Sequence, residues 1–256
     1  ALARCDILLL DDGSTDDTPA AAARYRGRIE YLRQENAGLA AARNAAIRAC
    51  PNEFVALLDD DDLWEPDKIE RQLAALEQWP DVVMVAGRAV NQFADGRRHL
   101  RPIPSIPLNR PADLAPLLFE TNFLPPSTVM LRTRTLFEVG LFHPQLRRAE
   151  DQHLWIRMAC RGPCVVLNEL VAAYAMDTPS ALSGNASRQI LAQIRAYYLV
   201  QDALRERPDC RPQWQRGLGR ALTDLRDVAY RQQHYVTAAR YGLRSARTDQ
   251  AESFAW

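Results

Sequence analysis

Two apolar runs, each followed at once by aspartates, constrain the fold of this chain most strongly. Ile7–Leu10 precedes Asp11–Asp12, and Phe54–Leu58 precedes Asp59–Asp62. An apolar run of four or five residues is typical of a strand buried on both faces, as in a parallel sheet. Ligands of open α/β sheets bind beyond the carboxyl ends of the strands, so the two clusters are expected to face one site. The carboxylates would repel each other there, and a divalent cation with a phosphorylated ligand is the simplest group to join them.

The rest of the first half alternates between strand and helix patterns. The sequence predicts strands at 5–10, 29–32, 54–58 and 82–86, and helices at 14–26, 38–50 and 66–79. This order is typical of an α/β fold with a mostly parallel sheet and helices on both faces.

A Pro-rich connection follows, from residue 91 to 126, with a helix expected at 112–119. Such a long connection inside a compact domain is often a binding loop. Beyond it the sequence predicts strands at 127–131, 164–167 and 170–174, and helices at 133–139 and 150–160.

The character of the chain changes after about residue 184. Apolar residues recur at helical spacing in three sets, which predicts three amphipathic helices. The sets are Ile190, Ile194 and Tyr197; Leu218, Leu222, Leu225 and Ala229; and Val236, Ala239 and Leu243. We therefore expect two domains, 1–184 with the site and 185–256 as a C-terminal helical subdomain.

Composition excludes several function classes. The 32 basic and 32 acidic residues cancel, which argues against a nucleic-acid binder that relies on bulk charge. Five cysteines at irregular spacing favour reduced thiols and a cytoplasmic protein. No apolar run approaches the ~18–20 residues of a membrane span, so no integral membrane segment is expected.

Several short motifs occur in a fixed order along the chain. They are Asp11-Asp12-Gly-Ser; Asn36-Ala-Gly followed by Arg43; Asp59-Asp60-Asp61-Asp62; Pro126-Ser-Thr; and Glu150-Asp151. Each is weak alone, because an acid pair can also form a turn or cap a helix. Their ordered succession, over about residues 5 to 180, resembles the GT-A glycosyltransferases often called family 2. The resemblance implies a GT-A, Rossmann-like fold.

The resemblance also implies a nucleotide-sugar site. Asp11 or Asp12 would accept the ring N–H of a uracil base, with Asn36 close by. Arg43 would contact the base or a phosphate, and Asp59 the ribose hydroxyls, beside Asp60.

Metal and catalytic roles follow from the same resemblance. Asp61, with Asp59, would bind Mn²⁺ or Mg²⁺, which neutralises the departing diphosphate. Asp151 would be the base that deprotonates an acceptor hydroxyl, and Glu150 would hold its geometry.

The expected function is therefore an inverting transfer of one sugar from a nucleotide-sugar, UDP-linked in the first instance, to a glycan or lipid-linked acceptor in bacterial surface glycan synthesis. A peripheral position at the inner face of the membrane stays open, as does the oligomeric state. The alternatives are a non-catalytic nucleotide-binding module and a haloacid dehalogenase-like phosphatase with Asp11 as nucleophile.

Two departures from the family accompany the resemblance. The family begins with another strand and helix, so the chain is expected to be truncated at its N-terminus. The absent strand would lie between the strands that end at Leu10 and Leu58, and its loss would expose two strand edges. Asp177 stands where many relatives have a histidine.

Overall fold

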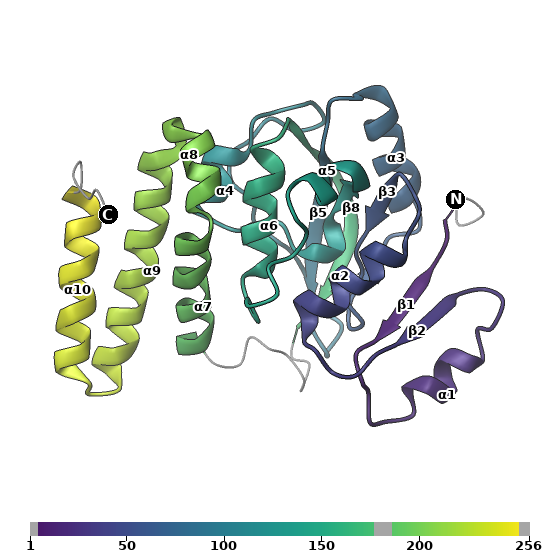
Figure 1. Cartoon of the computed structure of the whole chain (residues 1–256), viewed down its shortest axis with the longest axis horizontal. Coiled ribbons are helices and arrows are strands. Elements are labelled where there is room, and N and C mark those ends of the chain that lie inside the picture. Colours follow the sequence, from purple (N-terminus) through teal and green to yellow (C-terminus); the bar gives the residue numbers. More distant parts are fainter. Residues whose placement is uncertain (1–4, 177–185, 251–256) are drawn as a thin grey trace.

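The structure is a computed structural model that describes residues 5–176 and 186–250. Its strands are β1 (Leu8–Asp11), β2 (Glu30–Arg33), β3 (Phe54–Ala56), β4 (Leu63–Trp64), β5 (Met84–Gln92), β6 (Arg98–Leu100), β7 (Met130–Arg132) and β8 (Cys164–Ala175). Its helices are α1 (Thr18–Ala23), α2 (Leu39–Ala49), α3 (Lys68–Gln78), α4 (Ala115–Glu120), α5 (Thr133–Glu138), α6 (Glu150–Ala159), α7 (Ala186–Leu199), α8 (Gln201–Glu206), α9 (Arg211–Arg231) and α10 (Tyr235–Gln250), with 3₁₀ turns at Pro126–Thr128 and Pro208–Cys210. Figure 1 shows a central sheet with long helices on one side and a small sheet on the other.

The strands form two separate sheets. A six-stranded sheet has the order β3-β7-β5-β8-β4, with β6 paired to β5, while β1 and β2 form a two-stranded parallel sheet. The α/β class is confirmed, but strand directions are mixed, because only β5–β8 and β1–β2 run parallel among the described pairs. The short β7 enters between β3 and β5 after the Pro-rich connection and runs antiparallel to both. An apolar run predicts burial of a strand and leaves its direction unspecified.

One continuous strand replaces two predicted ones. The sequence predicts a break at Asn168–Glu169, whereas β8 continues through it and its register against β5 shifts near Gly87. A Cβ on Gly87 would lie 2.5 Å from Val171 Cγ1. The absence of a side chain at Gly87 therefore lets the two strands stay paired through the irregularity.

Alternating residues of β5 point into two cores. Met84 and Ala86 pack on the side of α2, α4, α5 and α6, while Val85 packs against Ile69 and Leu76 of α3. Both faces of the sheet are therefore covered by helices, as predicted for an α/β fold.

The α3 core contains the only lysine of the chain. Lys68 is fully buried, and its Nζ donates a hydrogen bond to Gln72 Oε1 at 2.5 Å. The ammonium also lies 4.4 Å from the centre of the Trp64 ring. Burial lowers the pKa of Lys68 to about 7. Gln72 Nε2 in turn donates to the carbonyls of Val85 and Thr128, so this polar group ties α3 to the sheet.

Two of the three predicted C-terminal helix faces are correct. Tyr197 of α7 and Leu218 and Leu222 of α9 form one core cluster, against which Ile190 and Ile194 pack. The third is wrong, because Val236 and Leu243 of α10 are 71% and 63% exposed.

Helix α10 packs on α9 through a different face, which includes Ala238 and Gly242. These two residues are small, so a pattern of large apolar residues does not predict this face. The expected domain boundary between residues 184 and 185 lies outside the described residues, as does Asp177. Within the described ranges, none of the helices is long and apolar enough to cross a membrane.

Candidate active site

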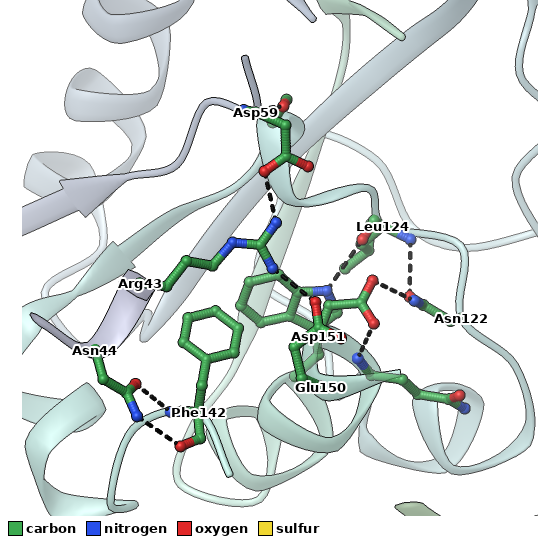
Figure 2. A network of polar contacts seen from close by, with 11 residues as sticks. Arg43, Asn44, Asp59, Asn122, Leu124, Phe142, Glu150 and Asp151 are labelled. Atoms are coloured by element: carbon green, nitrogen blue, oxygen red, sulfur yellow. Dashed lines mark hydrogen bonds and ion pairs between the residues drawn. The ribbon is translucent and has the colours of Figure 1, made fainter. Parts of the chain in front are cut away.

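Arg43 joins two of the predicted motifs. Its Nη2 lies 2.5 Å from Asp59 Oδ1, and its Nη1 lies 2.8 Å from Glu150 Oε1. Figure 2 shows the guanidinium between these two carboxylates, above the ring of Phe142. Arg43 belongs to α2, so its two ion pairs connect this helix to the loop after β3 and to the start of α6. The side chain of Arg43 is 9% exposed, so this charge is compensated by its two partners rather than by bulk water.

The ring of Phe142 packs against the guanidinium of Arg43. The guanidinium carbon lies 5.4 Å from the ring centre, which is within cation–π range. Asn44, the residue after Arg43, exchanges two hydrogen bonds with the backbone of Phe142, at 2.8 and 2.9 Å. No pattern in the sequence connects Phe142 with this motif, since 98 residues separate it from Asn44.

Glu150 and Asp151 form the first turn of α6. The preceding residue, Ala149, has a positive φ of 55°, a conformation that residues other than glycine rarely adopt. Such strain is found preferentially at functional sites, and here it aims the first turn of α6 toward Arg43. Glu150 is 5% exposed and Asp151 half-buried.

The two acids have weakened tendencies to ionise. Burial raises the pKa of Glu150 to about 7, with repulsion from Asp151 adding to the effect and Arg43 opposing it. Burial also raises the pKa of Asp151, against hydrogen bonds from Gln152 N–H and Asn122. A carboxyl group whose pKa moves toward neutrality is suited to exchanging protons near pH 7.

Asn122 is a site residue that the sequence analysis missed. Its Nδ2 donates to Asp151 Oδ2 at 2.8 Å, from the segment just after α4. The N–H of Gln152 bonds Asp151 Oδ1 at 2.7 Å. Both oxygens of Asp151 are thereby oriented, as Figure 2 shows. Asn122 lies in the Pro-rich connection, where composition indicated a binding loop and no motif singled out a residue.

The four aspartates after β3 lie in different environments. Asp60 and Asp61 are exposed, Asp59 is half-buried against Arg43, and Asp62 is buried. Asp62 Oδ1 accepts a hydrogen bond from Ala175 N–H at 2.9 Å, while its buried Oδ2 has no partner among the described residues. Burial raises the pKa of Asp62 to about 6.

Ser127 supports this acidic loop from the predicted Pro-Ser-Thr motif. Its Oγ accepts from Asp59 N–H at 3.0 Å, and its carbonyl accepts from Trp64 Nε1 at 2.9 Å. The ring of Trp64 also contacts the ammonium of Lys68. The buried α3 network therefore reaches the loop that carries Asp59.

Asp11 and Asp12 lie on the small sheet, and their hydrogen bonds run to its neighbours. Asp11 accepts from Tyr31 Oη at 2.5 Å and Ser14 N–H at 2.7 Å. The Tyr31 bond is the main reason why the pKa of Asp11 falls to about 2. The side chain of Asp11 is fully buried, so it is badly placed to attack a phosphate, which argues against the phosphatase alternative.

Asp12 secures the loop that enters α2. Its oxygens accept from Gln34 Nε2 and from the N–H groups of Ala37 and Gly38, at 2.6 to 2.9 Å. Asp12 keeps partial exposure, unlike the Asp11 side chain. A shallow hollow of about 490 Å³ lies beside it, lined by Gly13, Arg33, Gln34, Glu35 and Asn36. Asn36 thus lies at the edge of a concave surface, and its binding of a ligand stays a prediction.

The acidic loop suits a metal ion only with help from a ligand. Among the residues that the structure describes, no group of three or more His, Cys, Asp or Glu side chains is arranged to hold a metal. Mg²⁺ and similar ions are often bound by one or two carboxylates together with substrate phosphates. The exposed Asp61, beside Asp59 and the unpartnered Asp62 Oδ2, fits such a shared site.

Comparison with known proteins gives a consistent family. The model of glycosyl transferase family 2 matches residues 2–140. An uncharacterised glycosyltransferase of Rickettsia conorii is 34% identical over 159 residues, which are 61% of this chain and 26% of that protein. The teichuronic acid biosynthesis glycosyltransferase TuaG of Bacillus subtilis, itself a putative assignment, is 27% identical over 184 residues, 70% of either chain. This chain spans about a quarter of the length of the first rickettsial relatives.

Solved structures agree in fold. Residues 1–349 of Staphylococcus aureus TarS, in complex with UDP-GlcNAc, superpose with a TM-score of 0.63 at 18% identity, covering 98% of this chain and 83% of that one. The mannosyltransferase PcManGT of Pyrobaculum calidifontis, with GDP-Man and Mn²⁺, gives a TM-score of 0.55 at 16% identity, covering 99% and 80%.

Proposed function

Because this chain belongs to glycosyl transferase family 2, we propose that it transfers one sugar from a nucleotide-sugar to a hydroxyl acceptor, with inversion at the anomeric carbon. The observation that carries the proposal is the bridge made by Arg43. One guanidinium links Asp59, on the acidic loop, to Glu150, the neighbour of the proposed base. This bridge supports the proposal because it brings together residues from distant parts of the sequence that are proposed to bind the donor and to accept the proton.

The proposed base is Asp151. As the acceptor oxygen bonds to the anomeric carbon, Asp151 takes the hydroxyl proton and the bond from that carbon to the diphosphate oxygen breaks. The electron pair leaves on the nucleoside diphosphate. Asn122 orients the carboxylate, and the raised pKa of Asp151 improves it as a proton acceptor. Glu150 pairs with Arg43 and so fixes the first turn of α6.

The nucleotide is proposed to occupy the region from the hollow beside Asn36 to the acidic loop. Asp12, which is partly exposed, is better placed than Asp11 to accept a base N–H. Asp59 and Asp60 would contact the sugar-nucleotide. Mn²⁺ or Mg²⁺, held by Asp61 and Asp59, would supply positive charge at the departing diphosphate. A UDP-linked donor is favoured because the TarS complex contains UDP-GlcNAc, while PcManGT contains GDP-Man and makes GDP-sugars the second class to test.

The acceptor is proposed to be a glycan or lipid-linked sugar of a bacterial envelope polysaccharide. TuaG carries a name from teichuronic acid biosynthesis, and AmsE of Erwinia amylovora one from amylovoran biosynthesis. A cytoplasmic location, with or without peripheral membrane contact, belongs to the same proposal. The division into a catalytic domain, 1–184, and a helical subdomain, 185–256, is also part of this proposal.

The experiment has a binding arm and a turnover arm. UDP and GDP binding is measured by calorimetry with and without Mn²⁺, and release of the nucleoside diphosphate is measured with UDP- and GDP-sugars. We expect Asp151→Asn to lower turnover by about 10²–10⁴-fold with UDP affinity retained. Asp61→Asn should abolish the effect of Mn²⁺ on UDP binding. Asp202→Asn, an exposed acid on α8, is the matched control. Nucleotide binding with no turnover of any sugar would favour the non-catalytic alternative.

A further inference from the structure

A buried polar chain crosses from α6 to the C-terminal helices. Gln152, next to Asp151, is 2% exposed, and its Nε2 donates to Leu118 O at 3.1 Å and to Tyr197 Oη at 3.3 Å. Tyr197 of α7 is also 2% exposed, and its hydroxyl donates to Glu120 O at 3.0 Å. Two polar side chains thus connect the helix of the proposed base to the end of α4.

The end of α4 is also held by α9. The carboxylate of Glu120 accepts from Arg216 at 3.1 and 3.2 Å and from Arg220 at 2.8 Å. Asn122, two residues further on, donates to Asp151 Oδ2. The segment that orients the proposed base is therefore fixed by its backbone to α7 and by its side chain to α9.

Helix α9 has a glycine, Gly217, at its contact with Tyr197. A Cβ on Gly217 would overlap with Tyr197 Oη and would lie 2.7 Å from Phe119 O. Trp214, on the same helix, donates from Nε1 to Tyr197 O at 2.8 Å. The close approach at Gly217 and the bond from Trp214 leave the tyrosine hydroxyl little freedom to move away from Glu120.

We propose that Tyr197 is a positioning residue for Asp151, acting through the carbonyl of Glu120 and the side chain of Asn122 on one path and through Gln152 on the other. The inference rests on the proposed function and gives the helical subdomain a part in it. A catalytic group has to be held within about 0.5 Å of its working geometry. Asn122 and Gln152 are the two residues that donate hydrogen bonds to the Asp151 carboxylate, so a hydroxyl that fixes both of them affects the chemical step. Donor binding is proposed to depend on Arg43 and the acidic loop, whereas the hydrogen bonds of Tyr197 and Gln152 described above run to other residues.

The test is Tyr197→Phe, which removes one oxygen atom and keeps the ring. We expect kcat for nucleoside diphosphate release to fall about 10- to 100-fold, with the Kd for UDP and Mn²⁺ unchanged within twofold. Tyr198→Phe is the matched control, because that neighbouring tyrosine is 47% exposed. It should leave kcat and Kd unchanged.

The pH profile separates positioning from simple support of the fold. The hydrogen bond from Asn122 favours the ionised form of Asp151, so a misdirected Asn122 should move the acid limb of kcat to higher pH. In an Asn122→Ala background, Tyr197→Phe should have much less effect on kcat than in the wild type, because one shared path has already been lost.

Two results would overturn the inference: a Tyr197→Phe protein with a lower Tm but the kcat and pH profile of the wild type, or effects of the two substitutions that multiply independently. Gly217→Ala should also lower kcat. If the Gly217→Ala protein does not fold, the Tyr197→Phe protein still decides the question. The series includes the wild type and Asp151→Asn. An inactive wild type would refute the proposed function, whereas an active wild type, an inactive Asp151→Asn and a normal Tyr197→Phe would refute only the positioning role.

Discussion

Two of the pairs of adjacent acids in this chain lie in contrasting surroundings. Asp11 and Asp12 end a strand of the small sheet, and both accept hydrogen bonds chiefly from neutral donors. Glu150 and Asp151 begin α6 beside a buried arginine, and burial raises both of their pKa values. The pKa of Asp11, by contrast, falls to about 2. Adjacent acids therefore give a carboxylate that stays ionised, Asp11, in one place and a pair with raised pKa values in the other.

Arg43→Gln should break the comparison most severely. Glu150 and Asp59 would lose their shared counter-charge, and an uncompensated buried charge costs about 3–5 kcal/mol. At pH 8 we expect the Tm to fall by roughly 10 °C. At pH 5 the loss should be smaller, because Glu150 is then protonated. Calorimetry at the two pH values tests this, with Arg43→Lys as a partial rescue. An equal loss of stability at both would contradict the charge argument.

Asp11→Asn should weaken the small sheet. The charge-assisted bonds from Tyr31 and Ser14 are worth about 1.5–3 kcal/mol. Since the pKa of Asp11 is lowered in the folded state, this stabilisation is present above about pH 4 and is lost as the pH falls through about 2. Hydrogen exchange of the β1 and β2 amides at pH 7 measures the effect. Tyr31→Phe should reproduce part of it, and unchanged exchange in both variants would be evidence against it.

Glu150→Gln should have the opposite sign. The pKa of Glu150 is raised to about 7 in the folded state, so folding binds a proton between about pH 4.5 and 7 and stability falls as the pH rises through that window. Glutamine resembles the protonated acid and avoids this cost. We expect a gain on the order of 1–2 kcal/mol at pH 8, with little difference at pH 4.5. Thermal melts across this range decide the sign, and a loss at pH 8 would mean that pairing with Arg43 outweighs burial.

Arg33→Gln should give the smallest effect. Its guanidinium lies 3.6 Å from Asp11, and its side chain is 48% exposed. Exposed ion pairs contribute about 0–1 kcal/mol and are weakened by salt. A change in Tm of more than a few degrees, or one that persists in 1 M NaCl, would show that Arg33 supports the small sheet in another way.

The sequence predicted the elements that repeat a local pattern. The helices at α2, α3 and α6 and the buried faces of α7 and α9 follow from apolar spacing, because burial of one helix face imposes that spacing. The outward face of Val236 and Leu243 could not be predicted in this way, since the small residues of α10 decide its packing.

The site could be predicted only in part, for a related reason. Acids after strands and at a helix start are visible as motifs, whereas Asn122, Gln152 and Phe142 act through partners that lie 29 to 98 residues away. Gln72 carries a weak sequence signal of this kind. A polar residue on the apolar face of α3, four positions after Lys68, indicates a buried network, and this one extends to the acidic loop.

The burial of Lys68 also determines how the folded protein reacts with amine-directed reagents. Every other cationic side chain of the chain is arginine or histidine, so acetylating, carbamylating and succinimidyl reagents find no side-chain amine on the surface. Opening of the core between α3 and the sheet would expose the one ε-amine and end the burial that holds its pKa at about 7, so the pKa would return toward its ordinary value. Modification of Lys68 therefore counts opening events of that core, and the chain carries its own single-site reporter of them.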